Sequence, residues 1–457
     1  MDKDYKNIGL NETEIELLFY DLTINKVGDR IYDSPLSTTR KVPHSHFIPS
    51  DEKVLAFIDK TVVDNFFNNG LPPPAFEKAG PRIKLFFEPG ETVSAIITCG
   101  GLCPGLNAVI RGIVMMNYYL YNNQRTYGIR YGYAGLIKEN GYEVQLLTPE
   151  TVGDIQMLGG TILGSSRGDQ DPVAMVDRLV ELGVDVLYTI GGDGTQRGAM
   201  AIMQEIEKRG LKIAVVGIPK TIDNDINFIE KSFGMETAFS EACNAIHAAH
   251  TEAKASYNGI GIVKLMGRES GFIAANATLA TNEVNLVLVP EVGFDLEGPG
   301  GILAMIEKRL QRRKHCVIVV AEGAGQEYVT DPQNPSYDAS GNLKLGDIGG
   351  FLKKTIAEYL KSKNVTNTIK YIDPSYIIRS CGPTPNDAIF CSQLAQMSVH
   401  AGMSGRTGLV VGFLNGQFIH IPMDLATSKR KQIDTDSPLW LSVLEATGQP
   451  MVLKNDL

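Results

Sequence analysis

From about residue 92, the chain alternates short apolar runs rich in β-branched residues with longer amphipathic stretches. The runs at 93–99, 184–190 and 212–218 are apolar at nearly every position, which is typical of strands buried on both faces of a parallel sheet. The stretches at 106–120 and 197–210 have the spacing of helices that cover such a sheet. The pattern therefore predicts an α/β fold with three layers, in which helices flank a mainly parallel sheet.

The same rhythm returns after a helix predicted at 236–255, with further strands at 258–266, 283–290 and 315–323. We therefore expect two α/β units. The first 90 residues differ, because they carry few periodic strands and contain Pro72-Pro73-Pro74. We expect them to form a mostly helical and irregular arm wrapped on the first unit.

Composition narrows the class of protein. The chain has 457 residues, 43% of them hydrophobic and 21% charged, which is the composition of a globular protein with more than one core. Its net charge is −9 and no basic stripe recurs, so we expect neither nucleic acid nor a membrane surface as a partner. The densest basic run, 308–314, ends a helical pattern and is predicted to be a solvated helix terminus.

Cysteine usage and hydropathy indicate the compartment. The six cysteines form no CxxC pair, and we interpret them as reduced thiols, with Cys103 as a small packing residue. No run of 18 apolar residues occurs and the N-terminus lacks a signal-peptide pattern. These features predict a cytoplasmic protein.

The unusual residues follow the predicted strands, where open α/β sheets bind their ligands. GGLCPG at 100–105 joins a strand to a helix, and its glycines would let backbone N–H groups approach a phosphate; a plain tight turn explains it equally well. GGDGT at 191–195 adds a carboxylate suited to Mg²⁺, although Asp193 could simply cap the next helix. The pentad also occurs in lipid kinases and NAD kinases, so it predicts a phosphate-donor site without naming the acceptor.

Two further stretches complete the set. In GSSRG at 164–168, Arg167 could clamp a phosphoryl group or form a surface salt bridge. The stretch PKTIDND at 219–225 ends an apolar strand with a lysine, a hydroxyl and two carboxylates. We interpret it as the acceptor side of phosphoryl transfer, with Asp223 as general base, Thr221 positioning the substrate and Asp225 assisting the metal. The alternative is that Asp223 and Asp225 merely cap the turn before the helix at 236–255.

Taken together, the motifs resemble the 6-phosphofructokinase family. GGLCPGLNAVIR, GGTILGSSR, GGDGT, PKTIDND and KLMGRESG occur in this order over roughly residues 92–430. AGPRIKLFF at 79–87 resembles the longer members, which use ATP yet are close in sequence to the pyrophosphate users. The resemblance implies phosphorylation of fructose 6-phosphate to fructose 1,6-bisphosphate in glycolysis, with ATP as the donor and Mg²⁺ as the cofactor.

The resemblance also implies roles residue by residue. The donor site would hold Mg²⁺ on Asp193 and ATP on Gly100, Arg167, Gly168, Gly191, Gly192, Asp193, Gly194 and Thr195. The fructose 6-phosphate site would consist of Thr221, Ile222, Asp223, Met266, Gly267, Arg268, Glu322, Tyr376, Ile377, Ile378 and Arg379.

The family resemblance predicts interleaved domains. An N-terminal arm would span 1–91, a nucleotide domain 92–234 with 378–430, and a sugar-phosphate domain 235–377 with 431–457, with the substrate in the cleft between the two domains. We expect a homo-oligomer, a tetramer or a dimer, since the family is usually tetrameric.

Three positions depart from the short bacterial members of the family. An arginine contributed there by the neighbouring subunit aligns with Gly259, and a histidine and an arginine align with Tyr376 and Lys370. The 6-phosphate pocket must therefore be built differently, and Lys370 is a candidate for part of its charge.

The donor is the point on which the alternatives differ. Pyrophosphate-using relatives typically carry aspartate at the position of Gly194 together with the lysine that is Lys220 here, so this chain has a mixed signature. A residue without a side chain at 194 leaves room for the α-phosphate, which favours ATP. The alternatives are a pyrophosphate-dependent enzyme of the same fold, a non-catalytic regulatory subunit, and a lipid or NAD kinase.

Overall fold

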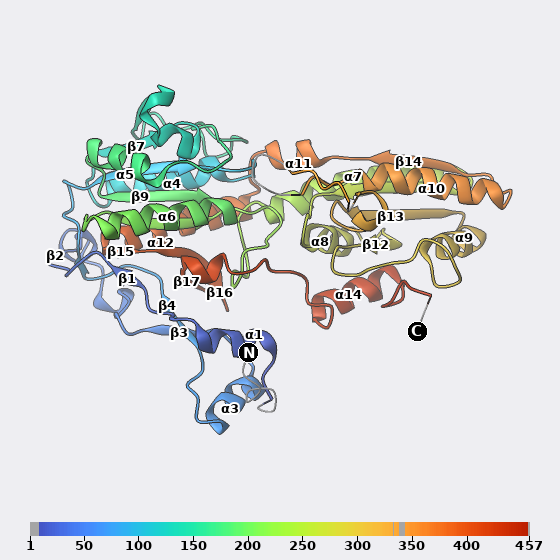
Figure 1. Cartoon of the computed structure of the whole chain (residues 1–457), viewed down its shortest axis with the longest axis horizontal. Coiled ribbons are helices and arrows are strands. Elements are labelled where there is room, and N and C mark those ends of the chain that lie inside the picture. Colours follow the sequence, from blue (N-terminus) through green and yellow to red (C-terminus); the bar gives the residue numbers. More distant parts are fainter. Residues whose placement is uncertain (1–8, 332, 338–342, 456–457) are drawn as a thin grey trace. The chain divides into compact units, whose positions relative to one another are not determined.

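The computed structural model describes residues 9–331, 333–337 and 343–455, shown in Figure 1. The chain divides into two compact units. Unit 1 comprises Met1–Thr221, Ile226–Phe233 and Pro385–Lys429, and unit 2 comprises Ile222–Asp225, Gly234–Thr384 and Arg430–Leu457. The chain therefore passes between the units several times. The expected boundaries differ at five points: the arm belongs to unit 1, whereas the 222–225 loop, Gly234, residues 378–384 and Arg430 belong to unit 2.

Unit 1 is built on a nine-stranded sheet in the order β3-β4-β17-β16-β10-β9-β6-β7-β8. Its central strands β16, β10, β9, β6 and β7 are parallel to one another, and the outer strands are antiparallel to their neighbours. Every residue of the three middle strands is buried, as the apolar runs predict. Seven of these strands lie outside the N-terminal arm: β6 (Val93–Thr98), β7 (Arg125–Ile129), β8 (Val144–Leu147), β9 (Val186–Gly191), β10 (Ala214–Pro219), β16 (Leu409–Leu414) and β17 (Gln417–Pro422).

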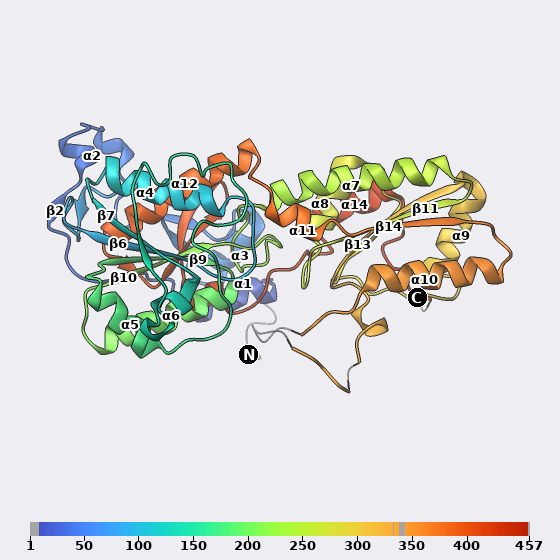
Figure 2. The same cartoon turned by 90° about the horizontal axis from the view of Figure 1, so that it is seen from above.

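Helices cover both faces of this sheet, so unit 1 has the three layers that the sequence predicts. One face carries α4 (Leu106–Tyr119) and α12 (Pro385–Met403), which pack against each other. The other face carries α5 (Pro172–Glu181) and α6 (Asp193–Lys208), as Figure 2 shows. The α/β fold class is confirmed.

The N-terminal arm contributes strands to the sheet, which its sequence does not predict. The edge strands β3 (Lys53–Leu55) and β4 (Ala75–Lys78) extend the sheet beyond β17. Both are short, and β4 directly follows Pro72–Pro74, so no periodic pattern marks them. The other arm elements are α1 (Glu12–Glu16), α2 (Pro35–Thr38), α3 (Lys60–Asn68), β1 (Asn25–Lys26), β2 (Tyr32–Asp33) and β5 (Lys84–Leu85).

A buried ion pair fixes the arm to the rest of unit 1. Glu77 of β4 accepts a hydrogen bond from Arg406 at 3.1 Å, and Arg406 is fully buried in β15 (Arg406–Thr407). His420 lies 2.7 Å from the same carboxylate. Burial opposes the charge of Glu77, but the hydrogen bonds from His420 and Arg406 outweigh it and hold the pKa of Glu77 well below its usual range.

Unit 2 contains a four-stranded parallel sheet in the order β12-β13-β11-β14. The strands are β11 (Gly259–Leu265), β12 (Leu286–Leu288), β13 (His315–Ala321) and β14 (Thr368–Ile372). Helices α7 (Met235–Ala255) and α8 (Phe272–Thr281) cover one face, and α9 (Ile302–Arg313) and α10 (Ile348–Ser362) cover the other, as Figure 2 shows. The remaining helices of the two units are α11 (Ser375–Ser380), α13 (Met423–Ala426) and α14 (Pro438–Thr447).

No helix in the described part of the chain is long and apolar enough to cross a membrane.

Candidate active site

The glycine loops of unit 1 converge on one place, although they are far apart in the sequence. The backbone N–H of Gly100, just after β6, donates to the carbonyl of Ser166 at 3.1 Å. Lys220 comes just after β10, and its ammonium donates to the carbonyl of Gly101 at 2.6 Å. Its backbone N–H donates to the carbonyl of Gly191 at 3.0 Å. The ends of three neighbouring parallel strands and the 164–168 loop therefore form one candidate donor site.

Glycine is required at some positions of this site and optional at others. Gly100 has φ +83°, a left-handed conformation that side chains rarely adopt, and a Cβ there would lie 3.1 Å from the Lys220 ammonium. A Cβ on Gly191 would lie 2.1 Å from the hydroxyl oxygen of Thr195. Gly194 differs, because a Cβ there would meet nothing within 4 Å. The space at Gly194 is open, so the fold itself does not demand glycine there.

The helix that follows GGDGT presents its N-terminus to this place. Helix α6 begins at Asp193, so its first backbone N–H groups have no partner within the helix and favour an anion. One oxygen of Asp193 lies 2.6 Å from the guanidinium of Arg197, while the other is buried and has no hydrogen-bond partner in the described chain. A buried carboxylate oxygen without a partner suits a divalent cation. Arg167 is exposed, and a Cβ on Gly101 would lie 3.7 Å from its guanidinium.

Sequence reasoning missed Gln196, which holds two of the strand ends together. Its side chain is fully buried and its amide donates to the carbonyls of Gly191 at 2.9 Å and Ile218 at 3.3 Å. It therefore fixes the spacing between the ends of β9 and β10. A buried glutamine one residue after GGDGT is the only signal that could have indicated this role. Cys103, in contrast, is a buried packing residue as expected.

Asp223 lies in unit 2, in the tight loop 222–225. Its carboxylate accepts from the backbone N–H of Arg268 at 3.4 Å, and its other oxygen is buried without a hydrogen-bond partner among the described residues. The hydroxyl of Ser270 donates to the Asp223 carbonyl at 2.9 Å, which anchors the loop to the segment after β11. Burial, together with the negative charges of Asp225 and Glu322, raises the pKa of Asp223 far above its usual range.

Asp225 is held by a segment that the motifs do not include. Its carboxylate lies 3.6 Å from the guanidinium of Arg430, and its carbonyl accepts from the backbone N–H of Lys431 at 2.8 Å. Thr221, which the sequence analysis groups with these carboxylates, lies in unit 1 and accepts at its carbonyl from Ser232 at 2.5 Å. The motif PKTIDND is thus divided between the two units.

The ends of β11 and β13 bring the next predicted residues together. Arg268 follows β11, and Glu322 follows β13. The backbone N–H of Glu322 donates to the carbonyl of Leu265 at 2.9 Å. Burial raises the pKa of Glu322, although the nearby charges of Arg268, Lys264 and Arg379 oppose the shift. Gly323 was missed by the sequence analysis; a Cβ there would lie 1.8 Å from the Arg268 carbonyl, so only glycine allows this approach.

Helix α11 supplies the remaining predicted residues of unit 2. Tyr376 and Ile377 are exposed, at 76% and 68%, and the Arg379 guanidinium lies 4.6 Å from the centre of the Tyr376 ring. Ile378 is fully buried, so its side chain packs the helix onto unit 2 and offers no surface to a ligand. Together with the charges around Glu322, this arrangement provides acidic groups for hydroxyls and an arginine for a phosphate.

Comparison with known proteins identifies the family. Residues 93–401 match the family described as Phosphofructokinase. The chain belongs to the phosphofructokinase family. Among the most similar proteins is the ATP-dependent 6-phosphofructokinase of Borreliella burgdorferi, 49% identical over 95% of this chain and 98% of that protein. Another, of the same name, comes from Amycolatopsis methanolica and is 47% identical over 94% of this chain and 95% of that protein.

Solved structures agree on the fold. The pyrophosphate-dependent phosphofructokinase of Marinobacter aquaeolei has a TM-score of 0.64 at 18% identity, and the match covers 78% of this chain and 91% of that one. The phosphofructokinase of Pichia pastoris in the T-state has a TM-score of 0.60 at 23% identity, with 75% and 36% covered. At these identities the likeness concerns the phosphofructokinase fold alone.

The structure explains why this member of the phosphofructokinase family has Gly259. A Cβ at this position would lie 2.1 Å from the carbonyl of Ala253, at the end of α7, so no arginine fits. Lys370 lies on β14, where it pairs with Gly261 of the neighbouring strand β11. Its ammonium is 3.7 Å from the carboxylate of Glu252 on α7. Within unit 2, the Lys370 ammonium therefore faces a carboxylate of α7, whereas Arg379 lies on α11.

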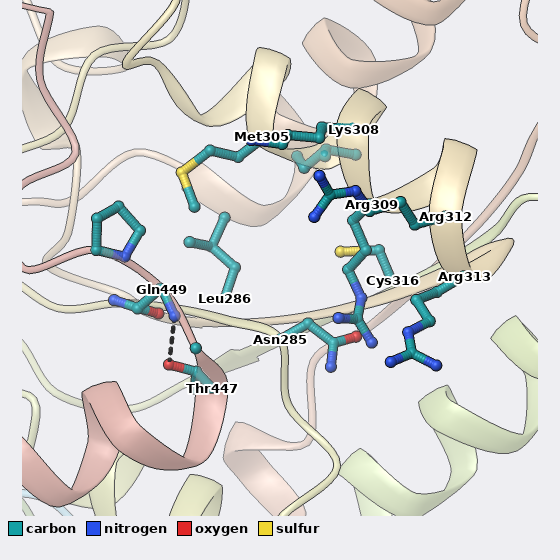
Figure 3. A pocket seen from close by; sticks show the side chains of 13 residues that line it. Asn285, Leu286, Met305, Lys308, Arg309, Arg312, Arg313, Cys316, Thr447 and Gln449 are labelled. Carbon is teal, nitrogen blue, oxygen red and sulfur yellow. Dashed lines mark hydrogen bonds between the residues drawn. The ribbon is translucent and has the colours of Figure 1, made fainter.

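The basic run at 308–314 forms the solvated end of α9 that the sequence predicts, since Lys308 and residues 311–314 are exposed, and it also borders a cavity. The cavity has a volume of about 420 Å³ and lies in unit 2, between α9, the start of β12 and the segment after α14, as Figure 3 shows. Lys308, Arg309, Arg312 and Arg313 contribute its positive charge, because the last turns of α9 turn these side chains toward it. None of the predicted site residues lines this cavity, so it is separate from the candidate active site.

Proposed function

We propose that the chain is an ATP-dependent 6-phosphofructokinase, which transfers the terminal phosphoryl group of ATP to the 1-hydroxyl of fructose 6-phosphate. The observation that carries the proposal is Asp223, a carboxylate with an unpartnered oxygen and a raised pKa in the acceptor loop. Curated relatives 45–49% identical to this chain carry the same name, which supports the reaction and the choice of ATP.

Asp223 would act as the general base. A sugar hydroxyl attacks phosphorus poorly until its proton is removed, and a carboxylate with a raised pKa accepts that proton more readily than an ordinary aspartate does. The unpartnered oxygen of Asp223 is the one available for the proton. Arg268 holds the other oxygen through its backbone N–H, which orients the carboxylate.

The sugar phosphate would be held by the other groups of unit 2. Arg379 would pair the 6-phosphate, and the Glu322 carboxylate would accept hydrogen bonds from sugar hydroxyls. Met266, half-buried after β11, would pack against an apolar edge of the sugar. The side chain of Ile378 is buried, so only its backbone could contact the sugar phosphate.

Unit 1 would hold the donor. The backbone N–H groups at the start of α6 and in the loop after β6 would bind the phosphates, and Arg167 would neutralise the transferring group. The open space at Gly194 accommodates a donor that continues beyond its second phosphate. Lys220 is compatible with ATP, because its ammonium donates to a loop carbonyl and so shapes the donor site itself.

Mg²⁺ fits the residues present. Asp193 offers a buried oxygen without a hydrogen-bond partner, and Asp225 offers a second carboxylate in unit 2. When bound, the ion would neutralise charge on the phosphates of the donor. Asp193 of unit 1 would hold it, and Asp225, the other metal residue expected from the sequence, lies in unit 2.

A coupled assay with fructose 6-phosphate tests the proposal directly. It is run with ATP, with pyrophosphate, and with ATP after removal of divalent cations and stepwise return of Mg²⁺. We expect turnover with ATP that depends on Mg²⁺ and negligible turnover with pyrophosphate. Turnover with pyrophosphate alone would identify a pyrophosphate-dependent enzyme, and turnover with neither would indicate a non-catalytic subunit.

We further propose a cytoplasmic homo-oligomer, a tetramer or a dimer. Light scattering coupled to gel filtration would measure the oligomeric state, and a monomer would contradict it. Localisation would be followed with a fluorescent fusion, since one Arabidopsis thaliana relative is named chloroplastic.

A further inference from the structure

Lys264 occupies a position in unit 2 where the strand pattern demands an aliphatic residue. Alternate residues of β11 point to the same face of the sheet, and the two preceding members of its set, Ile260 and Ile262, lie in the core beneath α9 and α10. The Lys264 side chain is only 16% exposed. Burying an ammonium costs free energy unless the ammonium is paired with an opposite charge, so the partners of Lys264 indicate why a lysine is found here.

The partners of Lys264 are carboxylates at the ends of two other elements. Its ammonium lies 2.8 Å from Asp373, immediately after β14, and 3.6 Å from Asp347, immediately before α10. Burial opposes the charge, but the hydrogen bond to Asp373 and the charges of Asp373, Asp347 and Glu322 raise the pKa of Lys264. Lys264 is therefore a cation held among carboxylates, an environment that disfavours direct binding of a phosphate.

The two carboxylate oxygens of Asp373 have different partners, Lys264 and the first residue of helix α11. One oxygen faces the Lys264 ammonium. The other accepts from the backbone N–H of Ser375 at 3.2 Å and from its hydroxyl at 2.6 Å, at the first residue of α11. Helix α11 carries Tyr376 and Arg379, so the ion pair fixes the beginning of the element that presents them.

Lys264 itself lies on β11, the strand that leads into the other predicted sugar-phosphate residues. Lys264 precedes Met266 by two residues and Arg268 by four, on the strand that continues into them. Asp347 is fixed in turn by the hydroxyl of Tyr371 at 2.7 Å, from the last residues of β14. The elements joined by Lys264, namely β11, β14, α10 and α11, are labelled in Figure 2.

We propose that Lys264 is a positioning residue for the sugar phosphate: through Asp373 it sets the placement of α11, and so of Arg379, relative to the Met266–Arg268 segment. It contacts neither the substrate nor the reacting atoms. The inference rests on the proposed function, because it assigns Lys264 to the fructose 6-phosphate side of that reaction. It also supplies a role for the first residue of the motif KLMGRESG, to which the sequence analysis assigns none.

The test is a double-mutant cycle on the enzyme as it exists, with Lys264→Met, Asp373→Asn and both together. We expect each single variant to raise KM for fructose 6-phosphate about tenfold, the loss of one hydrogen bond to a charged group, with kcat and KM for ATP within about threefold of wild type. The double variant should be no worse than either single variant, because both changes break one pair. Lys264→Arg, which keeps the charge, should restore most of the affinity.

Lys138→Met is the matched control, since the Lys138 ammonium pairs with Glu181 at 2.6 Å on the surface of unit 1. It should leave both KM values unchanged. A normal KM for fructose 6-phosphate in Lys264→Met, an equal rise in both KM values, or additive effects in the double variant would each overturn the inference. If Lys264→Met does not fold, Asp373→Asn decides alone: a normal KM overturns the inference. Wild-type turnover is measured first, so failure of the proposed function is seen separately.

Discussion

The donor loops of unit 1 and the acceptor loops of unit 2 both occupy the carboxyl ends of parallel strands, yet they are built from different groups. On the donor side the groups that meet are mainly backbone: Gly100, Gly191 and the start of α6. On the acceptor side they are side chains, above all the carboxylates of Asp223 and Glu322, whose pKa values burial raises.

The difference follows from the two chemical tasks. Phosphate oxygens are bound by many N–H groups at short range, which requires glycine and leaves little room for side chains. Removal of a proton requires a side chain whose pKa is shifted toward the working pH. Substitutions in the two regions should therefore affect different kinetic constants.

The largest effect is expected at the base. Asp223→Ser should leave the fold intact and lower kcat by about 10²–10⁴-fold, the usual contribution of general-base catalysis. The measurement is steady-state kinetics at saturating substrates, with circular dichroism to confirm folding. A kcat within about threefold of wild type would remove Asp223 from the mechanism.

The next effect concerns the donor side. Gly194→Asp should reduce kcat/KM for ATP by at least about a hundredfold, because a carboxylate about 5 Å from the α-phosphate repels it by roughly 3 kcal/mol at an effective dielectric near 20. KM for fructose 6-phosphate should change little, and slow turnover with pyrophosphate could then be sought.

Gly194→Ala is the control for this variant, because the space at this position is open and a methyl group should be accepted by the fold. Comparable losses in Gly194→Ala and Gly194→Asp would show that shape, and not charge, governs the donor.

A smaller effect is expected at the phosphate end of the acceptor site. Arg379→Ala should raise KM for fructose 6-phosphate by about 10- to 100-fold, since it removes a charge-assisted contact already made with the bound substrate. KM for ATP should be nearly unchanged. An equal rise in both constants would mean that Arg379 does not belong to the sugar-phosphate site.

The smallest effect is a shift in pH dependence. Burial first, and then the charge of Asp225, raise the pKa of Asp223 to about 8, and the base works only when deprotonated. The ratio kcat/KM for fructose 6-phosphate should therefore fall as pH decreases through that value. Asp225→Asn removes the negative charge, lowers the pKa of Asp223 and should move the acid limb to lower pH.

Loss of Mg²⁺ would raise the pKa of Asp223, opposite to the shift expected from removing the Asp225 charge, so wild type and Asp225→Asn are compared at saturating Mg²⁺. Asp424→Asn, on the short helix α13 of unit 1, should leave the limb in place. A limb that stays unmoved in Asp225→Asn would show that the two carboxylates are not electrostatically coupled.

Most of the fold and many of the candidate residues could be predicted from local sequence. Apolar runs such as 93–99 and 184–190 became strands buried at every position, and glycine loops follow their ends. These features are local, because burial on both faces and left-handed turns each impose their own residue types.

Other features could not be predicted locally. The strands β3 and β4 are too short to show a period, and they exist because β17 offers them an edge. Gln196 and Gly323 matter only because other strand ends approach them. Ile378 carries the same apolar letter as Ile377, yet one is buried and the other is 68% exposed.

The sequence by itself thus determined the α/β class, the motif residues and their chemical types. Only the tertiary structure decided which of those groups meet: that Lys220 reaches the Gly100 loop, that Arg268 supports Asp223, and that Lys264 pairs with Asp373. The physical reason is range. Backbone conformation and burial period are set by neighbours in the chain, whereas hydrogen bonds and pKa shifts depend on groups that the fold brings together from distant positions.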